Sequence, residues 1–195
     1  MKEVEFYFDV GSPAAYLAWT QLPRIAQETG AALVFRPMLL GGVFQATGNH
    51  SPMQVPAKGR YVMADLERFA HRYGVAFRHN PFFPINTLAL MRGAIGLQMR
   101  DEARMAPYAD AVFRAIWVEG LDMGEPQVVG TALQRAGFDP QALFALASEP
   151  EVKERLKAAT QEAVARGVFG APTFFVGSQM YWGQDRLDFV KEALQ

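Results

Sequence analysis

Apolar residues crowd the first segment of the chain in a pattern that is typical of a buried strand. Residues 4–10 (VEFYFDV) are rich in β-branched and aromatic side chains and stop at Gly11, so we expect a strand that is buried on both faces. Ser12 and Pro13 then mark a helix start, because the serine hydroxyl can cap a free amide and proline has no amide to leave unpaired. The helix is expected to end at Gly30.

A second strand over residues 32–39 (ALVFRPML) completes a β-α-β unit with parallel strands and a right-handed crossover. From residue 41 to about residue 166 helical spacing replaces strand spacing, as in the apolar stripes of residues 63–73 and 112–117. Capping residues predict further helix starts in this block: Asn86, Asp139 with Pro140, and a capping box of Ser148 with Glu151.

Strand chemistry returns after Gly170. Residues 172–176 (PTFFV) and 179–182 (QMYW) predict a hairpin, and Asp185 is expected to cap a last helix. The order β-α-β, helical block, β-β-α is that of an α/β, thioredoxin-like fold with a large all-helical insertion. We expect the thioredoxin-like domain to comprise residues 1–40 and 167–195, and the inserted helical domain to comprise residues 41–166.

Composition and charge narrow the range of functions. Half of the 195 residues are hydrophobic, and 19 basic side chains stand against 20 acidic ones. The chain can therefore bury a core, and it lacks the strong field that attracts nucleic acid or a membrane surface. No segment has the length and apolarity of a membrane span, and the opening residues resemble a strand rather than an export signal. We expect a cytoplasmic protein with a small ligand.

The absence of cysteine from the sequence excludes a disulfide oxidoreductase, thiolate metal sites and an intrinsic thiol nucleophile. The three histidines, His50, His71 and His79, are too scattered to indicate a metal site. Any thiol chemistry on this scaffold must therefore use a thiol that comes from a ligand.

Ser12 is the first candidate for such chemistry. A plain N-cap is the simpler interpretation. A helix N-terminus also stabilises an anion and lowers the pKa of a thiol placed there, and thioredoxin-like proteins carry their reactive cysteine at this junction. A hydroxyl cannot replace a thiolate as nucleophile, but it can donate a hydrogen bond to a thiolate that a ligand brings.

Pro172 and the pair Gln184-Asp185 are the other candidates. Pro172 opens the strand before the last hairpin, where a thioredoxin fold has its cis proline, although an ordinary trans proline is the alternative. Ala171 would then offer its backbone to an extended peptide. Asp185 is either a routine cap or, with free amides beside it, a site for the ammonium and carboxylate of a ligand.

Five motifs together resemble the 2-hydroxychromene-2-carboxylate isomerases and the related kappa-class glutathione transferases, in the DsbA-like branch of the thioredoxin superfamily. They run nearly end to end: FYFDVGSPAAYLA, TGNHSP with PAKGRY, PINT, GVFGAPTFFV and YWGQDRL. By this resemblance, Ser12 activates the thiol of bound glutathione, and Ala171 beside Pro172 pairs with its middle residue. The remaining implied glutathione contacts are Asn49 and Lys58 to the tripeptide, and Gln184 with Asp185 to its γ-glutamyl end.

The same resemblance implies an activity. It is the glutathione-dependent conversion of 2-hydroxychromene-2-carboxylate to trans-o-hydroxybenzylidenepyruvate by reversible thiolate addition, in naphthalene-type aromatic catabolism. The partners would be glutathione, a small aromatic substrate and a second copy of the chain in a homodimer. A kappa-like glutathione transferase is the alternative enzyme. A DsbA-related peptide-binding module without redox chemistry is the alternative of another class.

Overall fold

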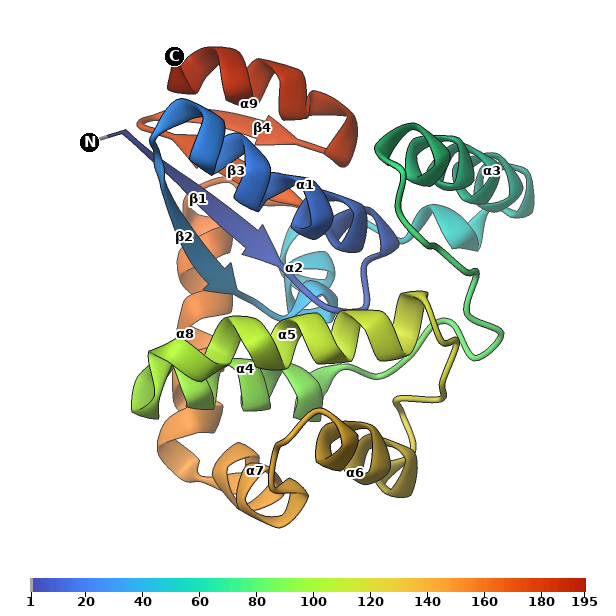
Figure 1. Ribbon diagram of the computed structural model, residues 1–195, viewed down its shortest axis with the longest axis vertical. Coiled ribbons are helices and arrows are strands. Elements are labelled where there is room, and N and C mark those ends of the chain that lie inside the picture. Colours follow the sequence, from blue (N-terminus) through green and yellow to red (C-terminus); the bar gives the residue numbers. More distant parts are fainter. Residues whose placement is uncertain (1) are drawn as a thin grey trace.

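Four strands form one mixed sheet in the computed structural model, which describes residues 2–195 (Figure 1). The strand order is β2-β1-β3-β4, with β1 and β2 parallel and the other neighbours antiparallel. The strands are β1 (Glu3–Phe8), β2 (Ala32–Pro37), β3 (Thr173–Val176) and β4 (Gln179–Trp182). The predicted strands and their β-α-β and β-β-α connections are therefore confirmed.

The first helix, α1 (Pro13–Thr29), connects β1 to β2. It begins at Ser12, whose side chain accepts a hydrogen bond from the Ala15 amide, and it ends at Gly30 in the left-handed conformation with φ of 67°. Only glycine adopts that conformation without steric cost. Both predicted ends of this helix are confirmed.

The rest of the chain between β2 and β3 is helical, as the apolar spacing predicts. Helices α4 and α5 lie side by side, and α8 runs from the region of α7 along the back of the sheet (Figure 1). The helices are α2 (Leu40–Thr47), α3 (Pro56–Tyr73), α4 (Leu88–Arg100), α5 (Glu102–Trp117), α6 (Pro126–Arg135), α7 (Pro140–Ser148) and α8 (Pro150–Ala165). Short 3₁₀ turns at Pro52–Gln54 (η1) and Gln184–Arg186 (η2) and a final helix α9 (Leu187–Leu194) complete the fold. No helix among residues 2–195 has the length and apolarity to cross a membrane.

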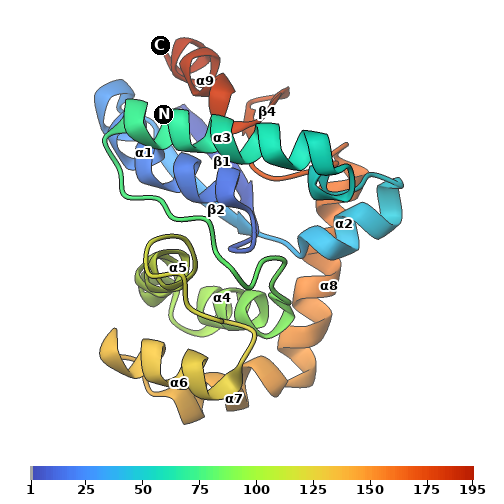
Figure 2. The ribbon, with the colours of Figure 1, turned by 90° about the vertical axis from the view of Figure 1, so that its right-hand side faces the viewer.

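Side chains of β1 alternate between two apolar layers, as the pleat of a strand requires. Val4, Phe6 and Phe8 pack in the larger core against α1 and the helices of the middle block, whereas Tyr7 lies on the other face in a smaller cluster with Phe175. Helices α2 and α8 cover that second face, and Figure 2 shows them on the same side of the molecule. The larger core includes residues from both predicted domains, and the division at residues 40 and 167 stays a prediction.

Two predicted caps are wrong, and a third is displaced by one residue. Ser148 is the last residue of α7 and donates to the Phe144 carbonyl, so Glu149 precedes α8 and the expected capping box does not form. Asp185 lies inside η2 instead of capping α9. Asn86 accepts from the Leu88 amide but stands one residue before the N-cap, Thr87. Asp139, in contrast, accepts from two amides of α7, as predicted.

Candidate active site

The junction of β1 and α1 places Ser12 at the amino end of a 17-residue helix. Its amide donates to the Asp9 carbonyl at 3.0 Å, and its hydroxyl oxygen accepts from the Ala15 amide at 3.1 Å. The side chain is only 5% exposed, while Pro13 and Ala14 beside it are half-buried. The residue is thus held in one orientation at the positive end of the α1 dipole.

Ser12 lies directly beside the residue that precedes Pro172. Its hydroxyl donates to the Ala171 carbonyl at 3.1 Å, across 159 positions of sequence. The Ala171–Pro172 peptide bond is cis. The predicted proximity of Ser12 and Pro172, and the predicted cis bond, are therefore confirmed.

Among the backbone amides at this junction, those of Ala14 and Ala171 have no protein acceptor within residues 2–195. Pro13 contributes no amide, and the Ala15 amide is taken by the Ser12 hydroxyl. An unpaired amide beside the start of a helix favours an anionic or carbonyl partner. One of these free donors is in the first turn of α1, and the other is in the loop that leads to β3.

Asn49 follows α2 and its C-cap Gly48, and it contacts the loop before β3. Its side-chain amide donates to the Phe169 carbonyl at 2.8 Å, and its side-chain oxygen accepts from the His50 amide. Phe169 packs against the half-exposed ring of Trp182, with ring centroids 5.0 Å apart. Asn49 thus lies beside the segment that leads to Ala171, with its polar atoms already engaged by backbone groups.

Gln184 and Asp185 follow β4 and lie close to Pro172, because the Gly183 amide donates to the Pro172 carbonyl at 3.0 Å. The Tyr73 hydroxyl donates to the Gln184 carbonyl at 2.8 Å, and burial with the nearby charges of Asp188 and Asp185 raises the pKa of Tyr73 to about 12. Asp185 is exposed and pairs through one oxygen with Arg186. Its second oxygen has no protein partner in the described chain.

Lys58 is not brought into contact with the other candidates. It is exposed in the first turn of α3, and no hydrogen bond or ion pair joins it to another residue of the 2–195 range. Tyr73, which contacts Gln184, lies at the far end of α3, about 22 Å away along the helix axis. The structure therefore joins Ser12 to Ala171 by a hydrogen bond, and within residues 2–195 no hydrogen bond or ion pair joins Lys58 to another candidate.

Asp9 is the residue at this junction that sequence reasoning missed. Its carboxylate is buried and accepts from the amides of Gly11 and Leu40, both at 2.8 Å, and from the Thr87 hydroxyl at 3.1 Å. Burial raises its pKa, against the hydrogen bonds, which lower it. An acidic residue ending a buried strand is the signal that could have drawn attention to it.

Comparison with known proteins places this arrangement in a family. Residues 3–195 match the DSBA-like thioredoxin domain family. A 2-hydroxychromene-2-carboxylate isomerase from Sphingobium xenophagum is 34% identical over 195 residues, which cover 99% of this chain and 98% of the relative. Glutathione S-transferase kappa 1 from Homo sapiens is 27% identical, over 99% of this chain and 91% of its own length.

A solved structure of a 2-hydroxychromene-2-carboxylate isomerase superposes with a TM-score of 0.86 at 32% identity, and the match covers 98% of this chain and 93% of that one. The chain therefore belongs to the DSBA-like thioredoxin domain family and, within it, to the family of the 2-hydroxychromene-2-carboxylate isomerases.

Proposed function

We propose that this protein is a glutathione-dependent isomerase that converts 2-hydroxychromene-2-carboxylate to trans-o-hydroxybenzylidenepyruvate. The observation that carries the proposal is the Ser12 hydroxyl at the positive end of α1, bonded to the Ala171 carbonyl, in a chain without cysteine. The family relationship supports the substrate. A cytoplasmic homodimer that serves naphthalene-type aromatic catabolism is part of the same proposal.

The residues at the junction fit a bound glutathione. The free amide of Ala171 and its carbonyl offer one donor and one acceptor to the backbone of the middle residue of the tripeptide. The unpaired oxygen of Asp185 can accept from the γ-glutamyl ammonium, with Gln184 beside it. Asn49 and Lys58 complete the proposed set, and contacts from Asn49 would share or replace its bonds to the backbone.

The hemiketal ring of the substrate must first open, with its hydroxyl becoming the ketone and the proton passing to the phenolic oxygen. Bound glutathione would then supply a thiolate, whose addition to the conjugated double bond leaves a single bond that can rotate, and elimination of the thiolate restores the alkene. Ser12 then has a defined task. Its hydroxyl carries one hydrogen, which it now donates to the Ala171 carbonyl. By turning that hydrogen toward a sulfur anion, Ser12 can stabilise the charge together with the Ala14 amide and the α1 dipole.

The activity is tested by following the absorbance of a chromene carboxylate with catalytic amounts of glutathione. We expect isomerisation without consumption of glutathione, and Ser12→Ala should lower kcat by about 10- to 100-fold with a smaller rise in KM. The matched control is Ser148→Ala, which removes an exposed hydroxyl bonded to a backbone carbonyl on α7. Turnover that needs no glutathione, or that Ser12→Ala leaves unchanged, would contradict the proposal.

A kappa-like glutathione transferase is the second candidate, and the 27% identity with the human kappa 1 enzyme favours it as the alternative. It predicts stoichiometric loss of glutathione in the same assay. A peptide-binding module without redox chemistry predicts no heat on titration with millimolar glutathione. The two measurements separate the three functions.

A further inference from the structure

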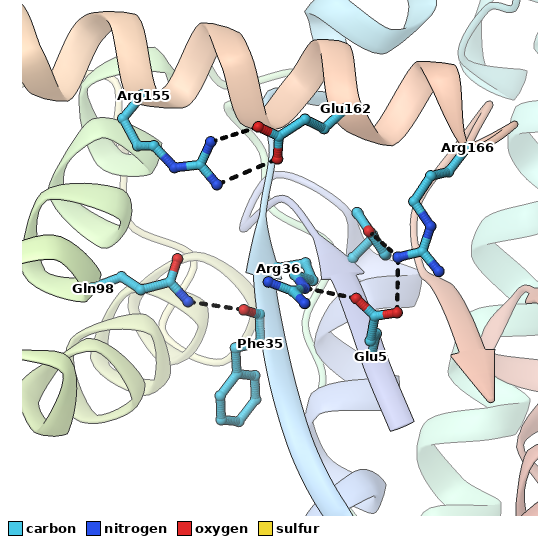
Figure 3. A network of polar contacts seen from close by, with 8 residues as sticks. Glu5, Phe35, Arg36, Gln98, Arg155, Glu162 and Arg166 are labelled. Carbon is cyan, nitrogen blue, oxygen red and sulfur yellow. Dashed lines mark hydrogen bonds and ion pairs between the residues drawn. The ribbon is translucent and has the colours of Figure 1, made fainter. Parts of the chain in front are cut away.

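A cleft of about 420 Å³ opens on the face of the sheet opposite α1. Strands β1 and β2 form one wall and helices α4 and α8 the others, as Figure 3 shows for the residues drawn there. None of the proposed glutathione contacts lines it. Its volume is within the range of small-ligand sites, which run from about 300 to about 1,000 Å³.

Three guanidinium groups and two carboxylates line this cleft. Arg36 comes from β2, Arg155 from α8 and Arg166 from the end of α8, whereas the acids are Glu5 of β1 and Glu162 of α8. These three cations and two anions give the lining a net charge of +1. The hydrogen bond from Arg155 lowers the pKa of Glu162, and the charge of Arg36 lowers it further, so Arg36 lies within electrostatic reach of Glu162.

Glu5 fixes two of the arginines. It is 8% exposed, and its two oxygens accept from Arg36 at 2.7 Å and from Arg166 at 2.8 Å. Burial raises the pKa of Glu5, but the hydrogen bonds and charges of Arg166 and Arg36 outweigh it and hold the pKa below its usual value. Arg166 is further held over the Phe175 ring, with its guanidinium carbon 3.9 Å from the ring centroid, and donates to Tyr7. The buried carboxylate therefore holds both cations in place at the base of the cleft.

Most donor groups of these arginines remain available. The two terminal nitrogens of Arg36, and one terminal nitrogen of Arg166, have no protein acceptor within residues 2–195. Arg155, also on α8, forms two hydrogen bonds with the Glu162 carboxylate, at 2.8 and 3.3 Å. The pair is exposed, with 38% and 60% of the side chains accessible, so opening it costs little.

We propose that this cleft binds a small organic monocarboxylate, with its carboxylate between the guanidinium groups of Arg36 and Arg155. Guanidinium forks match a carboxylate in a planar, two-bond geometry. The exposed Ala165 and the largely buried Ile95 and Ala159 line the same cleft and give a short hydrophobic body apolar contacts. One excess positive charge favours a monoanion, because the two resident carboxylates repel any further negative charge.

The test is a titration of the full chain with benzoate, followed by two-dimensional NMR so that the shifted resonances locate the ligand. We expect Arg155→Gln to weaken binding about tenfold and Glu162→Gln to tighten it several-fold, because the first removes a donor and the second frees one. Arg24→Gln is the matched control, since Arg24 is an exposed arginine in an ion pair on α1. The Arg24→Gln variant should bind benzoate with the same affinity as the unmodified protein.

Opposite shifts from two residues of one ion pair cannot come from a general loss of structure. Binding of uncharged benzamide with equal affinity would overturn the proposal, because the cleft would then recognise only the ring. Equal effects of Arg155→Gln and Glu162→Gln, or shifts confined to the surroundings of Ser12, would overturn it as well. The benzoate titration tests this site independently of the proposed isomerase activity, since neither the titration nor its variants involve glutathione.

Discussion

Asp9 joins three segments of the chain through one buried side chain. Its oxygens accept from Gly11 before α1, from Leu40 at the start of α2 and from Thr87 before α4. The carboxylate has no cation among these partners. It therefore positions the segment that carries Ser12 relative to the helical block, while its own charge is costly to bury.

The stability of the protein should depend on pH through Asp9. Burial raises its pKa above the ordinary 3.8, so the stabilisation it contributes is full below that value and is lost as the pH rises through the folded-state pKa. We expect the difference in unfolding free energy between the unmodified protein and Asp9→Asn to shrink as the pH rises above 3.8. Urea unfolding at several pH values measures it.

Glu5→Gln is the control with the opposite sign. The pKa of Glu5 is held below its ordinary 4.5, so its stabilisation is present above that value and is lost as the pH falls. A difference for Asp9→Asn that grows with pH would show that the Asp9 pKa is depressed and that our assignment is wrong.

Sequence reasoning predicted the proximity of Ser12 to Ala171 and Pro172 but missed Asp9, and the reason is physical. The Ser12 position follows from a local pattern, a strand that stops and a cap that starts a helix. The bonds of Asp9 to Leu40 and Thr87 span 31 and 78 positions, and no local periodicity encodes such returns of the chain.

Among the secondary-structure elements, the helix caps show where the sequence pattern and the structure differ. Asp139 and Ser148 both precede predicted helices, but only Asp139 accepts from the free amides of its helix, those of Gln141 and Ala142. Ser148 continues α7 because Pro150 two residues later supplies the next start. Residue type alone therefore does not decide which of two neighbouring residues caps a helix.

We expect Asp139→Ala to cost about 1 kcal/mol of unfolding free energy, the usual value of an N-cap. Ser148→Ala, which removes only a bond to the Phe144 carbonyl on an exposed surface, should change it by less than about 0.5 kcal/mol. Chemical denaturation of both variants gives the comparison. Equal losses would mean that Ser148 acts as the cap after all.

Helix α2 shows a second limit of pattern reading. The Gly41-Gly42 pair gives no helical propensity, yet α2 begins at Leu40, whose amide donates to the Asp9 carboxylate. A side chain from another element therefore does the capping that the sequence around α2 lacks.

Glycine also sets the close approach of α4 and α5. A methyl group at Gly93 would lie 2.8 Å from the Tyr108 ring carbon that carries the hydroxyl, and Tyr108 is fully buried and bonded to the Leu90 carbonyl. We expect Gly93→Ala to destabilise the protein by about 1–3 kcal/mol through overpacking. Gly130→Ala on α6 is the control, because its nearest neighbour would be at 3.7 Å.

The control should stabilise the protein by about 0.5–1 kcal/mol, the gain of alanine over glycine inside a helix. Thermal unfolding distinguishes the two signs. If Gly93→Ala left the stability unchanged, the contact between α4 and α5 would be able to accommodate the extra methyl group, and the overpacking argument would be wrong.

In the molecule as a whole, the fold brings the start of the chain and the segment before its last hairpin together. Strand β3 pairs with β1, so the loop before β3 meets the loop after β1, and the Ser12 bond to Ala171 is the result. The order of elements predicts this meeting, because the fold class fixes which strands are neighbours. The same order does not predict how far Lys58 lies from Gln184, since that depends on the direction of α3 over α1 (Figure 2).

We propose that Ser12 and the amino end of α1 stabilise a thiolate supplied by glutathione. The most direct measurement is the pKa of the glutathione thiol when bound, from its ultraviolet thiolate absorbance as a function of pH. We predict a value well below the roughly 8.5 of a free cysteine thiol, and a rise toward that value in Ser12→Ala. A bound thiol whose pKa equals that of the free thiol, or does not change in Ser12→Ala, would contradict this role of Ser12.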